Sequence, residues 1–342
     1  MFRLKNRNFK LFIFNNFFIL TFTLIACTFP NNDQGNNLVI YSGRSESIVD
    51  EIIKDFTEET GIQVDVRYAN STELANTIIL EGNNSPADLF FSQDPINLEK
   101  VAEQNLFTQL PNEIMQRSLN SNYQFNNYWI PTSIRVRTLG YNSTSTQQEE
   151  LPIDLYELIN PKYKNKIGLA PTNSSFITMV SCMIYFDGEE KTNTWLKNIH
   201  DQGYIEYPNN STQINAIDND EIKFGLVNHY YTLRYKSENQ TSNVKNYYFK
   251  SGCGSLVMPS GIGVLKTSKN QENATIFIEF LLNSNTQELI TNNLFEFPVI
   301  DIVNQNNQLP EINSFLNLEP NQWLELSKLQ TKAVELISKA GY

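Results

Sequence analysis

Positive charge is scarce in this chain. Its 342 residues include 26 Lys and Arg against 37 Asp and Glu, for a formal net charge of -11. Binding to nucleic acid depends on clustered Lys and Arg that displace counterions from the phosphates. The deficit therefore argues against a nucleic-acid partner.

Histidine and cysteine are also rare, with 2 His and 3 Cys. The sequence shows no Ser-His-Asp order, HExxH motif, P-loop or zinc-type Cys/His spacing. These absences disfavour a periplasmic enzyme, which stays open as an alternative class. No repeat of fixed period is present, and the length suffices for two globular domains.

The N-terminus has no apolar run long enough to span a membrane. A basic segment, MFRLKNRNFK, precedes a short apolar segment that Asn15 and Asn16 interrupt, which is typical of an export signal. Its end, Leu-Ile-Ala-Cys, resembles the lipobox of bacterial lipoproteins, which implies that Cys27 receives lipid. The sequence thus predicts a signal peptide over residues 1–26 and a lipid anchor with a flexible tether over 27–37. An ordinary signal peptide with a chance cysteine is the alternative.

Two cysteines remain for the exported protein, Cys182 and Cys253. An oxidising compartment permits a disulfide between them. Cys182 lies in an apolar helical run, where a free thiol behaves as a small hydrophobe, so a buried free thiol is the favoured interpretation. The sequence alone leaves the pairing open.

The mature chain alternates strands and helices. Residues 38–41 and 62–66 read as strands on either side of an amphipathic helix, a parallel α/β unit. Two long extended runs, 128–142 and 255–265, predict strands that cross between two lobes joined by a hinge. We expect residues 38–134 and 259–310 to form the first lobe, and residues 135–258 and 311–342 to form the second. One large mixed domain is disfavoured, because a single core rarely grows beyond about 250–300 residues.

Two adjacent tyrosines follow a predicted strand over residues 224–227. Neighbouring residues point toward one place only at a strand end or a turn, so Tyr230 and Tyr231 are either a binding site or two packing aromatics. The preceding His229 is more typical of a structural residue, or of one that supports a ligand, than of a ligand itself.

Six blocks in this order resemble the iron(III) solute-binding proteins of ABC importers. They are VIYSGRSE (39–46), EGNNSPADLFFSQD (81–94), IRVRTLGYN (134–142), YKNKIGLAPTNSSF (163–176), GLVNHYY (225–231) and LVMPSGIGVLKTSKN (256–270). The resemblance covers nearly all of the mature chain. It implies an α/β, two-lobed periplasmic-binding-protein fold of type II, with the lobes joined by two crossing β-strands.

The resemblance implies that Tyr230 and Tyr231 bind the metal. Chemistry supports this, since Fe(III) is a hard cation that favours anionic oxygen and lowers the pKa of a phenol it binds. Tyr41, Glu46 and Gln93 are possible additional donors. Some relatives carry histidine, glutamate and tyrosine where this chain has Ser45, Gln93 and Phe176, so an exogenous anion such as carbonate is expected to complete the coordination.

Relatives hold that anion on side chains and backbone N–H groups facing the cleft between the lobes. A helix N-terminus attracts anions, and an arginine meets them bidentately. The matching positions here are Arg44, Ser45, Arg135, Asn173, Ser174, Ser175, Asn210 and Asn228. Arg137 shares a strand face with Arg135 and is either buried with it or solvated.

The expected function is that of an extracytoplasmic lipoprotein receptor, in the periplasm or at the cell surface. It would act as a monomer, bind Fe(III) with a synergistic anion, deliver the iron to an ABC importer permease, and touch the membrane only through its lipid anchor. The alternative within binding proteins is the same fold with another small ligand, an organic anion or a thiamine-like molecule.

Overall fold

A mixed sheet organises the part of the chain that the computed structural model describes, residues 37–117, 127–301 and 306–342. These residues belong to one compact unit, Asn36–Tyr342. The predicted signal peptide and Cys27 lie outside the described residues. The nine strands are β1 (Leu38–Ser42), β2 (Val64–Tyr68), β3 (Leu89–Ser92), β4 (Ile130–Asn142), β5 (Ile167–Leu169), β6 (Tyr204–Glu206), β7 (Phe224–Asn228), β8 (Val244–Tyr247) and β9 (Val257–Val264).

The sheet has two halves of similar construction, in the order β2-β1-β3-β9-β4-β7-β5-β6. In the first half β1 lies parallel to β2 and β3, and β9 runs antiparallel to β3. In the second half β5 lies parallel to β6 and β7, and β4 runs antiparallel to β7. Parallel neighbours joined through helices are the expected result of the strand-helix alternation in the sequence.

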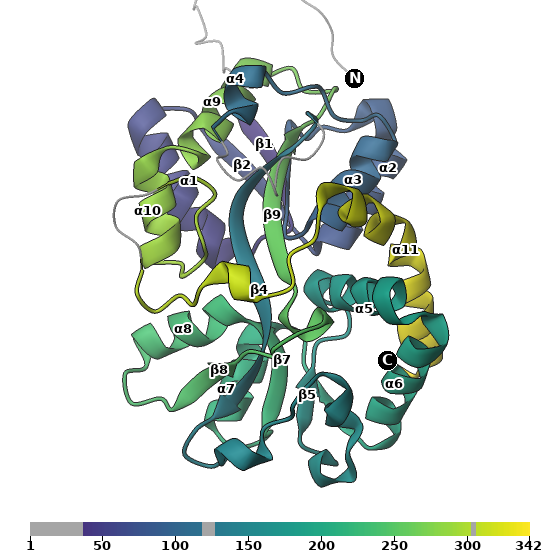
Figure 1. Cartoon of the computed structure of the whole chain (residues 1–342). Helices are drawn as coiled ribbons and strands as arrows, with labels where there is room; N and C mark the ends of the chain where they lie inside the picture. The colour runs from purple at the N-terminus through teal and green to yellow at the C-terminus, as the bar shows by residue number, and fades with distance from the viewer. Residues whose placement is uncertain (1–36, 118–126, 302–305) are drawn as a thin grey trace, which may run out of the picture. The chain divides into compact units, whose positions relative to one another are not determined.

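Strand β4 belongs to both halves. Its first part, residues 130–136, pairs with β9, and its second part, 137–142, pairs with β7 and β8. Twelve of its 13 residues are buried, which explains why it reads as a continuous run instead of an alternating one. Figure 1 shows β4 and β9 side by side along the middle of the molecule. The predicted extended runs are thus strands, and the lobe boundaries stay a prediction.

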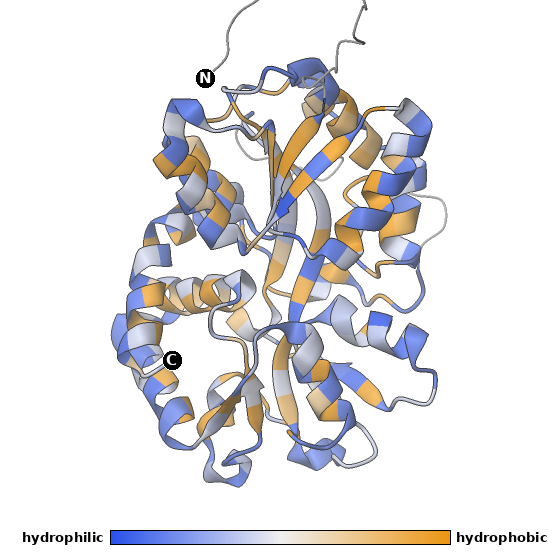
Figure 2. Cartoon of the chain, turned by 180° about the vertical axis from the view of Figure 1, so that it is seen from behind, coloured by the Kyte–Doolittle hydropathy of each residue, from blue (hydrophilic) through white to orange (hydrophobic). Residues whose placement is uncertain are grey.

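The helices cover the faces of the sheet and present their polar sides outward (Figure 2). In α1, for example, Ile48, Val49, Ile52 and Phe56 are buried, the face that the sequence predicted. No described helix is both long and apolar enough to cross a membrane. The helices are α1 (Glu46–Thr60), α2 (Ser71–Glu81), α3 (Pro95–Glu103), α4 (Asn112–Met115), α5 (Ser174–Asp187), α6 (Glu189–Asp201), α7 (Asn210–Asp218), α8 (His229–Glu238), α9 (Gln271–Leu281), α10 (Ser284–Asn292) and α11 (Pro320–Lys339).

The terminal helix α11 connects the two halves. It packs against α3 on one side and against α5 and α6 on the other. Figure 1 shows it running past both groups of helices. Its buried side chains, Trp323 and Leu326 among them, extend one apolar core across the junction.

The two cysteines of the mature chain form a disulfide, Cys182–Cys253. The favoured interpretation of Cys182 as a free buried thiol is therefore wrong. An apolar helical run predicts that the sulfur is buried but says nothing about which residue faces it. Here the turn before β9 brings Cys253 against α5, so the bond ties that helix to the central strands.

Candidate ligand-binding site

The tyrosine pair lies where β7 ends and α8 begins. Asn228 is the last residue of β7 and the N-cap of α8, so the chain changes direction directly before the pair. Tyr230 is fully buried and Tyr231 partly buried, and their rings stack with centroids 4.2 Å apart. The rings pack on each other, yet the buried Tyr230 hydroxyl has no hydrogen-bond partner among the described residues.

Two arginines of β4 reach the same region. Arg135 and Arg137 are two residues apart on the strand and therefore share a face, and both are fully buried. Arg137 donates to Asn228 Oδ1 at 3.1 Å and to the Leu226 carbonyl at 2.9 Å. Arg135 makes one long contact, 3.5 Å to Ser175 Oγ, and its Nε and Nη1 find no partner in the described structure.

The start of α5 supplies the opposite side. Asn173 caps the helix by accepting from the Ser175 N–H at 3.0 Å. Ser174 donates to Gln93 Oε1 at 3.2 Å, and Ser175 Oγ accepts from Asn228 Nδ2 at 3.2 Å. The predicted anion turn therefore joins the end of β3, the end of β7 and the middle of β4.

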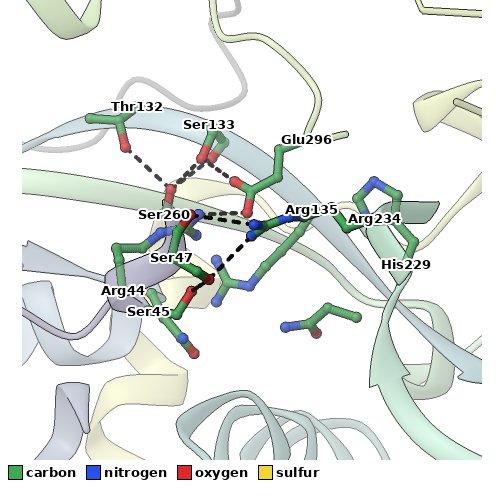
Figure 3. Close-up of polar contacts among 12 residues, drawn as sticks. Arg44, Ser45, Ser47, Thr132, Ser133, Arg135, His229, Arg234, Ser260 and Glu296 are labelled. Atoms are coloured by element: carbon green, nitrogen blue, oxygen red, sulfur yellow. Dashed lines mark hydrogen bonds and ion pairs between the residues drawn. The ribbon is translucent and has the colours of Figure 1, made fainter. Parts of the chain in front are cut away.

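A buried ion pair that sequence reasoning missed completes the cluster. Glu296 follows α10 in the chain, and its Oε1 lies 2.5 Å from Arg44 Nη2. Its Oε2 accepts from Ser133 Oγ at 2.5 Å, and Ser133 in turn lies 2.6 Å from Ser260 Oγ (Figure 3). The one sequence signal for Glu296 is a lone carboxylate between two phenylalanines, in LFEFPVI.

We call this set the central polar cluster. It contains the buried side chains that meet between the two halves of the sheet: Arg44, Gln93, Asp94, Arg135, Arg137, Ser174, Ser175, Asn228, Tyr230 and Glu296.

Asp94 is the second carboxylate of the central polar cluster. Its Oδ1 caps α3 by accepting from the backbone N–H and the side-chain amide of Asn97, at 3.1 and 2.8 Å. Its Oδ2 makes no well-aligned hydrogen bond within the described chain, although the nearby Ser174 hydroxyl acts to lower its pKa. Burial raises the pKa of Asp94, while the positive charge of Arg135 opposes that rise.

Burial and mutual repulsion act on the arginines. Burial, together with the charge of Arg135, lowers the pKa of Arg137 to about 9. Burial and the charge of Arg44 also lower the pKa of Arg135. Burial has the largest single effect on Arg44 and acts to lower its pKa, but Glu296 and the tyrosine pair together outweigh burial and the net shift is upward. Guanidinium groups with such shifts still favour a negatively charged partner.

The pKa values of two acidic members of the central polar cluster, Glu296 and Tyr230, shift in opposite directions. Burial acts to raise the pKa of Glu296, but the charges of Arg44 and Arg135 prevail and hold it below the usual value. Burial and the neighbouring Tyr231 raise the pKa of Tyr230 well above its ordinary value, against the pull of Arg44. Glu296 is therefore ionised at neutral pH, and Tyr230 is a protonated phenol.

His229 is packed as a structural residue, as its sequence context indicated. Its Nδ1 accepts from the Val136 N–H at 3.2 Å, and its ring lies against Phe297 with centroids 5.1 Å apart. Burial lowers the pKa of His229 to about 4. The side chain is therefore neutral at physiological pH.

Other sequence-predicted residues take their described hydrogen-bond partners from outside the central polar cluster. The Tyr41 hydroxyl donates to Glu81 at 3.0 Å and accepts from Arg67 at 3.3 Å. Glu46 is exposed, and the partly exposed Ser45 has its hydroxyl 3.4 Å from Ser47 Oγ. Asn210 is buried and accepts from Gln213 at 3.3 Å, while its Nδ2 lacks a described partner.

Within the described residues, no group of three or more His, Cys, Asp or Glu side chains is arranged to hold a metal ion. The central polar cluster offers phenol, carboxylate, amide and guanidinium groups instead. Phenolate and carboxylate oxygens are hard donors, and guanidinium groups bind anions. The arrangement suits a hard cation bound together with an anion.

Comparison with known proteins identifies the family. The family described as bacterial extracellular solute-binding protein matches residues 84–325. The Fe(3+)-binding periplasmic protein of Serratia marcescens is 31% identical over 314 residues, which is 90% of this chain and 91% of that protein. Iron-bound HitA from Pseudomonas aeruginosa superimposes with a TM-score of 0.83 at 29% identity, covering 90% of this chain and 100% of HitA. A Trichodesmium protein in complex with iron and citrate has a TM-score of 0.71 at 25% identity, covering 90% and 99%.

These matches confirm the predicted type II periplasmic-binding-protein fold and the prediction of a binding protein rather than an enzyme. They also support the predicted location outside the cytoplasm. The chain belongs to the bacterial extracellular solute-binding protein family, and ferric-iron-binding periplasmic proteins are among its relatives.

Proposed function

We propose that this protein captures ferric iron outside the cytoplasm, together with a small anion, and delivers the iron to an ABC permease. The observation that carries the proposal is the stacked Tyr230 and Tyr231 pair beside three buried arginines. Relatives named as ferric-iron-binding proteins support the choice of metal.

The Tyr230 phenol is suited to Fe(III) because it is protonated until the metal arrives. Burial holds the pKa of Tyr230 high, so the hydroxyl does not carry an uncompensated charge in the empty site. A trivalent cation displaces the proton, and the phenolate then neutralises part of its charge. Iron uptake is therefore coupled to proton release.

An anion completes the coordination. Fe(III) favours six oxygen donors, and the tyrosine pair supplies two. Carbonate would add two more while the free N–H groups of Arg44 and Arg135 hold it, with the α5 N-terminus at Asn173, Ser174 and Ser175. We extend this proposed anion site to Ser45, Asn210 and Asn228. Of the further candidate donors Tyr41, Glu46 and Gln93, only Gln93 lies in the central polar cluster.

Cys27 is the proposed membrane anchor, and it supplies the only contact of this monomeric receptor with the bilayer. The proposal rests on the Leu-Ile-Ala-Cys ending of the export signal. Intact-mass measurement of membrane-extracted protein tests it. A diacylated or triacylated N-terminal cysteine supports the anchor, and an unmodified N-terminus elsewhere contradicts it.

The second candidate ligand is an organic anion on the same fold. The unpartnered N–H groups of Arg44 and Arg135 favour it, because two buried guanidinium groups suit a carboxylate. The same positive charge disfavours a cationic, thiamine-like ligand.

The deciding experiment adds Fe(III), supplied as freshly diluted ferric chloride, to purified protein in carbonate-free buffer that contains no other chelating anion, and then adds bicarbonate. We expect a red to orange phenolate-to-iron absorption band that appears only with bicarbonate. A colourless protein that retains no iron after desalting would favour the organic anion. Full iron binding without any added anion would show that further protein ligands complete the coordination.

A further inference from the structure

Glu296 is a buried carboxylate to which the proposed iron and anion site assigns no role. Its side chain is 1% exposed and spans two partners, Arg44 on one oxygen and Ser133 on the other, each at 2.5 Å (Figure 3). A buried ion pair is costly to desolvate and is weak support for stability alone. Its place beside Arg44, in a binding site, suggests a role in ligand selection.

The backbone is strained directly before Glu296 and paired with β4 directly after it. The preceding Phe295 has φ 58°, a left-handed conformation that bulky residues rarely adopt. The following Phe297 exchanges both backbone hydrogen bonds with Ile134 of β4, each at 2.9 Å. Glu296 is thus fixed between a strained residue and a strand pairing, and its carboxylate faces Arg44.

The charges of the central polar cluster determine which anion charge neutralises the iron-loaded site. Its cations are Arg44, Arg135 and Arg137, and its carboxylates are Glu296 and Asp94. With both carboxylates ionised, one positive charge remains on the protein. Fe(III) with two phenolates contributes one more. A dianion such as carbonate neutralises this remainder, whereas a trianion such as citrate exceeds it.

We propose that Glu296 determines the charge of the anion that accompanies iron, so that the site favours a dianion over a trianion. This inference rests on the proposed function. Glu296 cancels the charge of Arg44, and in a buried site an uncancelled charge acts strongly on a bound ion. Removing the carboxylate favours the more highly charged anion, by about tenfold for one extra negative charge.

The substitution Glu296→Gln isolates this effect, because glutamine keeps the shape of glutamate. Its Oε1 can still accept from Arg44, and its amide can donate to Ser133, so the main change is the lost charge. Glu99→Gln is the matched control. Glu99 is a buried carboxylate of α3 that accepts from Trp129 Nε1 at 2.8 Å and lies outside the central polar cluster.

The measurement is an anion exchange on iron-loaded protein. Each protein is loaded with Fe(III) in bicarbonate, and citrate is then titrated in. After desalting removes free iron, the shift of the visible band of the protein-bound iron is measured at each citrate concentration. We expect Glu296→Gln to exchange at a citrate-to-bicarbonate ratio about tenfold lower than the wild type. Glu99→Gln should exchange at the wild-type ratio.

The outcomes separate the two proposals. If the wild type is coloured and Glu296→Gln exchanges at the same citrate-to-bicarbonate ratio as the wild type, the inference on Glu296 is overturned and the proposal of iron capture stands. A colourless wild type overturns iron capture and this inference together. If Glu296→Gln does not fold, the wild type is titrated with malonate, a dianion, beside citrate, a trianion. We expect malonate to exchange for bicarbonate at a lower ratio than citrate does, and an equal or lower ratio for citrate would overturn the inference.

Discussion

Burial keeps the side chain of His229, one residue before the tyrosine pair, uncharged at neutral pH. Its pKa in the folded protein is about 4, against an ordinary value of 6.5, so the folded form resists protonation while the unfolded chain accepts a proton. The contribution to stability is complete above pH 6.5 and is lost as the pH falls toward 4. The loss reaches about 3 kcal/mol of unfolding free energy.

The substitution His229→Asn tests this contribution. Asparagine Oδ1 can still accept from the Val136 N–H and does not titrate in this range. Urea unfolding at pH 7.0 and at pH 4.5 should show a smaller loss of stability for the variant than for the wild type. Equal losses would mean that His229 does not contribute to the pH dependence.

Sequence reasoning at the residue scale worked where a local rule applied. Strand alternation placed Arg135 and Arg137 on one face, and both side chains are indeed buried together. Glu296 was out of reach because its partner Arg44 lies 252 positions away and only the tertiary fold joins them. The partners of the Tyr41 hydroxyl were out of reach for the same reason, since Glu81 and Arg67 lie 40 and 26 positions away in the chain.

At the scale of elements, the Cys182–Cys253 bond joins α5 to the segment before β9 across a sequence separation of 71. Closing a loop of that length restricts the unfolded chain, which stabilises the folded form by about 4 kcal/mol. The double variant Cys182→Ala and Cys253→Ala should therefore unfold at a clearly lower urea concentration.

Reduction of the wild-type protein provides the control for that prediction. Because reduction opens the same loop without changing a side-chain volume, reduced wild type should lose most of the same stability. Coincident unfolding curves for oxidised and reduced wild type would contradict a stabilising role for the bond.

The elements were predictable where periodicity was strong. The amphipathic α1 and the buried β4 follow their patterns closely. The start of α8 at His229 was not predicted, because FGLVNHYY is a short apolar run that does not distinguish a strand end from a helix. The disulfide was left open, since spacing alone does not pair cysteines.

At the scale of the whole described unit, three side chains connect the two halves of the sheet and their helices. Arg234 of α8 contacts Ser47 of α1, Gln93 accepts from Ser174, and Asn70 donates to the Thr172 carbonyl at 2.7 Å. We expect such contacts to hold the lobes together around bound ligand, since ligand release requires them to separate.

The substitution Asn70→Asp tests one of these contacts. The new carboxylate can still cap α2 through the Thr72 N–H, but it cannot donate to Thr172 and repels that carbonyl. One lost hydrogen bond of about 1 kcal/mol predicts iron release to a chelator roughly fivefold faster. Asn209→Asp is the control, because Asn209 caps α7 in the same way and makes no cross-half contact among the described residues. Equal release rates for wild type and Asn70→Asp would remove Asn70 from this role.

The most direct test of the account is the visible spectrum and iron content of Tyr230→Phe and Tyr231→Phe. Each change keeps the stacked ring and removes one donor oxygen, so we expect the band to be bleached and iron binding severely weakened in a folded protein. Tyr247→Phe and Tyr248→Phe, in the second tyrosine pair of the chain, should keep wild-type colour and iron. If the protein with both Tyr230 and Tyr231 replaced by Phe stays coloured and binds iron at full strength, the tyrosine pair is not the iron site.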